Sequence, residues 1–218
     1  MRTTTAIHHI RNIALAASLV CLGAAAIAVP DAQFQPAFQQ FIQASTGDTA
    51  AVDQAAEAFS GLLKGEPTNP VLMAYAGAST AMRASTTMMP WKKMSFAEDG
   101  LSQLDKALAM LNASHDAPVQ RGTPGVLEVK YVAANTFLAV PGFMNRNERG
   151  AKLLGEVLAH PLFATAPLGF KGTVWLKAAK EASKANNTTE AKRYLDLIVQ
   201  QQAPQAAQAQ ALLKGQSS

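Results

Sequence analysis

Apolar side chains recur at helical spacing along most of this chain. Phe34, Phe38, Phe41 and Ile42 are four, three and one positions apart, which places them on one face of an α-helix. Thr46-Gly47-Asp48 is typical of the turn that ends such a helix. The same periodicity predicts further helices over 49–64, from Pro70, around 101–111, from Pro124, and over 146–159, 173–185 and 188–201. No segment sustains strict apolar–polar alternation, so we expect no β-strands.

Two predicted helix starts are similar at a distance of 50 residues. Met94, Ser95, Glu98 and Gly100 align with Met144, Asn145, Glu148 and Gly150. A polar residue with Glu three positions later is the pattern of a capping box, which satisfies free amides in the first helical turn. Asn187 and Glu190 have the same spacing. The pattern predicts that each such pair opens the second helix of a two-helix unit. The two aligned glycines would let a neighbouring helix approach closely.

The stretch Met89–Gly100 is interpreted as a turn within one such unit. Pro90 is expected to end the preceding helix and Ser95 to begin the next one. Trp91 is expected to cover the open end of the helix pair, and Phe143 to do the same in the following unit.

Several segments fit the order of the tetratricopeptide repeat, W-x2-L-G-x2-Y…A-x3-F…P. The best fit consists of Trp175, Ala178, Ala179, Ala182, Ala191, Leu195 and Pro204. Residues 55–67 fit the second helix of that repeat, and Pro90–Lys93 and Leu127–Tyr131 are similar to segments of exported bacterial repeat proteins. The chain therefore resembles the tetratricopeptide-repeat family. Its middle turns are longer than the family's, and Ala replaces most of the large consensus residues.

This resemblance implies an all-α fold, a right-handed α-solenoid of about four helix-turn-helix pairs over residues 29–203. The Gln- and Ala-rich residues 204–218 would be either a terminal capping helix or a frayed tail. The resemblance also implies a non-catalytic scaffold or protein-interaction module. Such repeats hold a segment of a partner, here of a cell-envelope protein, in a concave groove lined by the first helix of each pair.

Arg83, Lys130, Asn135 and Lys180 are the candidate partner-binding residues of this groove. Lys130 and Asn135 lie on the first helix of one unit, and Lys180 has a similar place in a later unit. The cations would favour an acidic partner segment. Asn135 stands in an apolar stretch, so its amide needs either a neighbouring helix or the backbone of a bound peptide.

Residues 1–28 have the pattern of a secretory signal peptide. Arg2 and Arg11 precede an apolar run, and Ala26-Ile27-Ala28 fits a cleavage site. This predicts a periplasmic or secreted protein, with no membrane insertion after cleavage. The alternative is an uncleaved anchor, because the apolar run reaches the short limit of a membrane-spanning helix. The only cysteine, Cys21, lies inside this segment.

Charge and motifs exclude several classes of function. Without residues 1–28 the formal net charge falls from +4 to +2, because two arginines and no acidic residue are lost, and this weakens a nucleic-acid interpretation. The remaining histidines, His115 and His160, lie near predicted helix ends, where capping explains them. The chain has no G-x-S-x-G, S-x-x-K or H-E-x-x-H motif and no Gly-rich phosphate loop. We therefore expect neither catalysis nor a cofactor.

Met88, Met89 and Met94 around Trp91 give the alternative function. Thioethers are soft ligands that suit Cu(I), and a tryptophan can cover such a site. An exported protein with this cluster could bind that metal outside the cytosol. The plainer interpretation is that these methionines fill gaps in a helical core.

Overall fold

The computed structural model describes residues 29–216, so the predicted signal peptide lies outside the described residues. Within 29–216 the chain forms α-helices, turns and short 3₁₀ helices, without a β-strand. The α-helices are α1 (Asp31–Ser45), α2 (Thr49–Gly65), α3 (Pro70–Thr86), α4 (Pro90–Ala109), α5 (Gly125–Phe137), α6 (Asn147–Ala159), α7 (Leu168–Lys184), α8 (Thr188–Gln200) and α9 (Ala206–Gln216). The predicted all-α class is confirmed. No helix in this part of the chain is long and apolar enough to cross a bilayer.

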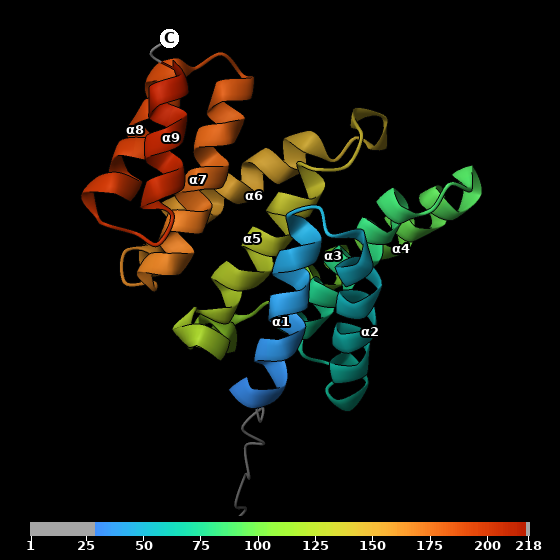
Figure 1. Cartoon of the computed structure of the whole chain (residues 1–218). Helices are drawn as coiled ribbons and strands as arrows, with labels where there is room; N and C mark the ends of the chain where they lie inside the picture. Colours follow the sequence, from blue (N-terminus) through green and yellow to red (C-terminus); the bar gives the residue numbers. More distant parts are fainter. Residues whose placement is uncertain (1–28, 217–218) are drawn as a thin grey trace, which may run out of the picture.

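Helices pack mainly against their neighbours in sequence, which is consistent with a helical repeat. The pairs are α1 with α2, α3 with α4, α5 with α6, and α7 with α8. α3 packs against α2 as extensively as α1 does, and also against α5 and α1. Every residue from 70 to 79 is buried. The contact of the α7–α8 pair with α6 is much smaller, and α9 packs on α8 beside the C-terminus (Figure 1).

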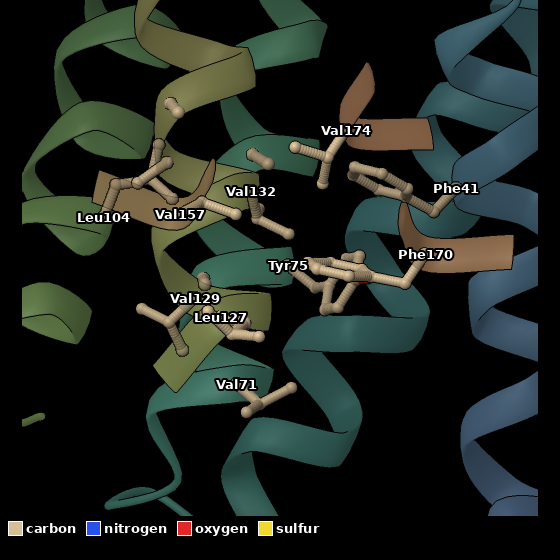
Figure 2. Packing of buried hydrophobic residues seen from close by; sticks show 14 of the residues in the cluster. Phe41, Val71, Tyr75, Leu104, Leu127, Val129, Val132, Val157, Phe170 and Val174 are labelled. Carbon is tan, nitrogen blue, oxygen red and sulfur yellow. The ribbon is translucent and has the colours of Figure 1, made fainter. Parts of the chain in front are cut away.

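The buried side chains form one continuous core. Phe41 of α1, Tyr75 of α3, Val132 of α5 and Val174 of α7 all belong to it (Figure 2). Tyr75 stacks on Phe59 with ring centroids 4.8 Å apart and meets the ring of Phe41 at a right angle, 4.9 Å away. These aromatic contacts bind the first three helices into a single layer of packing.

The segment between α4 and α5 crosses back over the start of the described chain. It contains the 3₁₀ helices η1 (Ala113–Asp116) and η2 (Gln120–Gly122). The buried Gln120 donates a hydrogen bond from Nε2 to the carbonyl oxygen of Val29, at 3.0 Å. This bond joins residues 91 positions apart, so the start of α1 is fastened by a segment from the middle of the sequence.

Close approach at the two aligned glycines is confirmed. A Cβ atom on Gly100 would lie 2.6 Å from the backbone nitrogen of Ala81 on α3. A Cβ atom on Gly150 would lie 2.8 Å from Cγ of Leu138, at the end of α5. In both pairs a side chain is absent where the partner helix comes nearest.

The predicted capping boxes at the aligned helix starts are wrong. α4 begins at Pro90, so Ser95 lies in its second turn and its hydroxyl donates to Asp99 at 3.2 Å. Pro90 opens α4 because the first helical position needs no N–H donor and favours the φ that proline imposes. Asn145 has φ 53° and precedes α6, which starts at Asn147. At α8 half of the prediction holds. The Asn187 side chain accepts from the Glu190 amide at 3.1 Å, but the Asn187 amide donates to the carbonyl of Ala182 and the Glu190 carboxylate accepts from Arg193.

Trp91 and Phe143 do not cover the ends of their helix pairs. Each is 69% exposed. The physical reason is that Trp91 lies in the first turn of α4, and Phe143 lies in the 3₁₀ helix η3 (Gly142–Met144), both beyond the buried part of their pair. Both rings are therefore available for contact with another molecule at the surface.

Candidate functional site

Two of the predicted binding residues are engaged in ion pairs between helices. Arg83 on α3 places Nε 2.7 Å from the Oδ1 atom of Asp53 on α2. Lys130 on α5 places Nζ 2.7 Å from Oε2 of Glu156 on α6. The Arg83 pair links two successive helix pairs, and the Lys130 pair links the two helices of one pair; both cations are largely neutralised by these acids.

The other two predicted residues lie in different surroundings. Lys180 is exposed at the edge of α7, beside a small hollow that Leu195 of α8 and Leu212 of α9 also line. Asn135 is half-buried on α5, one turn before Leu138, and its amide has no hydrogen-bond partner within residues 29–216. None of the contacts described above joins one of these four residues to another.

A cleft of about 680 Å³ lies between the α5–α6 pair and the α7–α8 pair. Beside it, α6 and α7 touch each other only slightly. Its lining residues are Leu138, Asn147, Glu148, Ala151, Leu154, Gly155, Leu158, Ala178, Glu181, Lys184, Ala185 and Tyr194. We call the leucines, of which Leu154 is buried, the floor of the cleft, and the polar residues, of which Asn147, Glu148 and Lys184 are exposed, its rim.

Small residues on both walls make the cleft hollow. Ala151 and Gly155 lie one turn apart on α6, and Ala178 and Ala185 face them from α7 and its end. A Cβ atom on Gly155 would meet nothing within 4 Å. Glycine in a helix interior costs about 1 kcal/mol relative to alanine, and at position 155 no tight packing compensates for that cost. Gly155 therefore leaves this part of the cleft wall open.

On the α7 side of the cleft, Glu181 forms ion pairs with two lysines of the same helix. Glu181 accepts from Lys177 at 3.1 Å and from Lys184 at 2.9 Å. Burial raises the pKa of Glu181, but the hydrogen bonds from Lys184 and Lys177 outweigh it and leave that pKa below its usual value. Burial lowers the pKa of Lys177, although Glu181 opposes this shift. Glu181 is therefore ionised at neutral pH and holds both lysines in place.

The opposite side of the rim carries Glu148, which is exposed and has no ion-pair partner in the described part of the chain. Tyr194 completes the rim, and burial raises the pKa of its hydroxyl, so it stays a neutral donor. Arg193 lies over its ring at 4.2 Å from the centroid. The charged side chains that line the cleft are Glu148, Glu181 and Lys184, with a formal sum of −1. Lys177, which lies outside the lining, pairs with Glu181 and offsets this charge, so the rim selects strongly neither an acidic nor a basic partner.

A second polar cluster lies deep between α3 and α5. The Tyr75 hydroxyl and Arg121 both donate to Oε1 of the buried Glu128. Arg121 has φ 60° and stacks its guanidinium over the Phe38 ring, 3.7 Å from the centroid. Burial raises the pKa of Tyr75 well above its ordinary value. Because Glu128 is buried and joins three segments, we interpret the cluster as a joint that holds α3, α5 and the α4–α5 segment together.

The methionine cluster is at the surface. Met88 is 89% exposed, and Met89 and Met94 are also exposed, at the start of α4. The interpretation of these residues as core fillers is therefore wrong. No group of three or more His, Cys, Asp or Glu side chains that could hold a metal ion occurs within residues 29–216.

Sequence reasoning missed the cleft and the buried Glu128 cluster. Gly155 was a sequence signal for the cleft, because a glycine inside an amphipathic helix destabilises that helix and usually has a packing or functional role. Arg121 and Glu128 gave no periodic signal, since Arg121 lies in a 3₁₀ segment with left-handed backbone. In comparisons with protein-family models, with curated proteins and with solved structures, nothing matches this chain.

Proposed function

We propose that this protein is an exported, non-catalytic binding module that takes a segment of a cell-envelope protein into the cleft between α6 and the α7–α8 pair. The pairwise packing of successive helices supports a tetratricopeptide-like, right-handed solenoid as its architecture. In such an arrangement the space between consecutive pairs is a natural place for a peptide to bind.

The observation that carries the proposal is the open space beside Gly155. An apolar floor with a polar rim is the arrangement that binds an amphipathic segment, because the floor takes apolar side chains and the rim orients the polar ones. Leu154 and Leu158 on α6 would receive the apolar anchors. Glu148 and Tyr194 would then bond polar groups of the same segment.

The cleft volume limits the occupant. Clefts of roughly 300–1,000 Å³ take drug-sized groups or a few side chains, and this cleft lies inside that range. The bound part is therefore a short segment, about one helical turn or a few extended residues.

A photoreactive amino acid at Ala151 tests the proposal in cells that make this protein. We expect it to crosslink one defined partner, and a photoreactive residue at the exposed Gly61 of α2 not to do so. A peptide covering the crosslinked segment should bind the purified protein. Fractionation and the mass of the mature N-terminus test export in the same cells.

Filling the cleft is the decisive control. Gly155→Leu should weaken peptide binding at least tenfold, whereas Gly61→Leu should leave it unchanged, because both glycines have open space around them and only Gly155 lines the cleft. Equal binding by the two variants would overturn the proposal, and so would crosslinking that is the same from both positions.

Cu(I) binding by Met88, Met89, Trp91 and Met94 is the second candidate function. Exposure of all four side chains favours it over core filling, because soft ligands on a surface turn are accessible to a metal carrier. Titration with Cu(I) should quench and shift Trp91 emission if this candidate is correct.

A further inference from the structure

The paired ends of α3 and α4 project from the molecule. Ala81 is the last buried residue of α3, Ala97 is the first buried residue of α4, and no residue from 82 to 96 is buried. Figure 1 shows this end, in green, reaching beyond the neighbouring helices. The close approach at Gly100 and the ion pair of Arg83 with Asp53 fix its base. We call residues 82–96 the α3–α4 tip.

The apex of the α3–α4 tip is apolar and convex. Met88, Met89, Trp91 and Met94 are among the few large apolar side chains that the described chain exposes. A protein partner of ordinary affinity needs roughly 800 Å² from each side, and four side chains around one turn provide only part of that area. A lipid interface makes no such demand, because it receives a small convex apolar group from any direction.

Charge on the α3–α4 tip indicates which surface it meets. Lys92 and Lys93 adjoin Trp91, and neither has an acidic partner in the described part of the chain. Glu98 follows Lys92 by six residues, and Asp99 follows Lys93 by six residues. At the rise of an α-helix, this places each acid about 9 Å farther along α4 than its lysine. Basic charge thus accompanies the apolar apex, and acidic charge is set back from it.

We propose that the α3–α4 tip binds the surface of an anionic lipid bilayer. Trp91 and the methionines would enter the headgroup boundary, where an indole ring is most stable. Lys92 and Lys93 would bond lipid phosphates while their alkyl stems lie along the apolar side chains. This contact is peripheral, requires no spanning helix, and leaves the cleft beside Gly155 open to its partner.

Tryptophan fluorescence tests the proposal on the full chain. Outside residues 1–28 the chain has two tryptophans, the exposed Trp91 and Trp175, which is 8% exposed. Vesicles of phosphatidylcholine mixed with phosphatidylglycerol should shift Trp91 emission to shorter wavelength, and bromine-labelled lipid should quench it. Vesicles of phosphatidylcholine alone should do neither. Trp91→Phe should remove both signals, because Trp175 stays buried in the core.

Charge reversal supplies the matched control. Lys92→Glu with Lys93→Glu should weaken vesicle binding by roughly tenfold or more, since each basic residue near an anionic surface contributes about 1 kcal/mol. Lys64→Glu with Lys106→Glu changes the net charge equally at other exposed positions and should leave binding nearly unchanged. Equal weakening by the two double variants would overturn the proposal. Vesicle binding without a Trp91 signal would also overturn it, as would a Trp91 response to Cu(I) but not to vesicles.

Discussion

In the α3–α4 pair three residues separate the two helices, whereas in the α5–α6 pair nine residues separate them. Pro90 stands at the first position of α4, so helix resumes at once. Pro141 is followed instead by the short η3 helix and by Asn145 in left-handed conformation, which delay α6 until Asn147. One pair therefore ends in a projecting helical tip and the other in an irregular loop.

The packing of the two pairs is nevertheless alike. Gly100 and Gly150, which align in the 50-residue register, both lie where the preceding helix comes closest. The residues aligned as caps, Ser95 and Asn145, take different roles. The comparison teaches that a repeated sequence register here preserves the contact between helices, while the turn is decided locally by proline and by left-handed residues.

Removing the joint between the two pairs should have the largest effect. Glu128→Ala leaves Arg121 and Tyr75 without their shared buried acceptor. We expect a loss of about 3 kcal/mol in the free energy of unfolding, at the lower end for breaking a buried ion pair because Arg121 is partly exposed. Urea denaturation measures it. Glu156→Ala removes the more exposed pair with Lys130 and should cost less than about 1 kcal/mol. If the two variants lose the same free energy of unfolding, Glu128 does not hold the segments together.

Gly100→Ala should separate α3 from α4. The added methyl group would overlap backbone atoms of α3, including the Ala81 nitrogen, and backbone cannot move aside without shifting the helix. Overpacking of this kind costs about 2–3 kcal/mol, which lowers Tm by roughly 5–10 °C in a domain of this size. Gly61→Ala, in open space, should raise Tm slightly. An unchanged Tm for Gly100→Ala would mean that the helices are not held at this distance.

Gly150→Ala should cost less than Gly100→Ala. Its closest neighbour is the Cγ atom of Leu138, a half-buried side chain that can move. The gain in helix propensity also offsets part of the clash, so we expect a net loss of about 1 kcal/mol. Comparing the calorimetric Tm of the two variants tests whether the α3–α4 crossing is the tighter one, and a larger loss at Gly150 would reverse that order.

The smallest effect should come from tyrosines at alkaline pH. Burial raises the pKa of both Tyr75 and Tyr131, so the folded state keeps protons that the unfolded state loses near pH 10. This contribution is fully present below about pH 10 and is lost as the pH rises above it. Tyr131→Phe should make the decline in urea midpoint above pH 10 less steep. At neutral pH this substitution should change stability little, since the hydroxyl bond to Thr173 is 3.4 Å long. A variant with the same pH profile as the natural protein would show that Tyr131 does not contribute to the alkaline decline.

Much of the fold follows from periodicity, and less of the site does. Helix positions were predictable because periodicity is local. The two tight glycines were predictable because they recur at the same place in the 50-residue register. The start of α4 was not, since Pro90 can end one helix or open another and only packing decides. Glu128 and Tyr75 are 53 residues apart, and no local pattern pairs them. The cleft is the space that remains between two packed helix pairs. A sequence does not show such a space directly, and the only local sign of it was a glycine, Gly155, inside a helix.

The hydrogen bond from Gln120 to Val29 has a consequence for the order of folding. A chain that emerges from its N-terminus first cannot seal α1 until about ninety further residues are available, because the seal spans 91 positions. Closure of so long a loop is slow compared with the formation of single helices. The first three helices can pack through their aromatic side chains earlier, but the start of α1 gains this bond only afterwards. The late seal is compatible with the export proposed above, because a chain must still be unfolded when it enters an export channel.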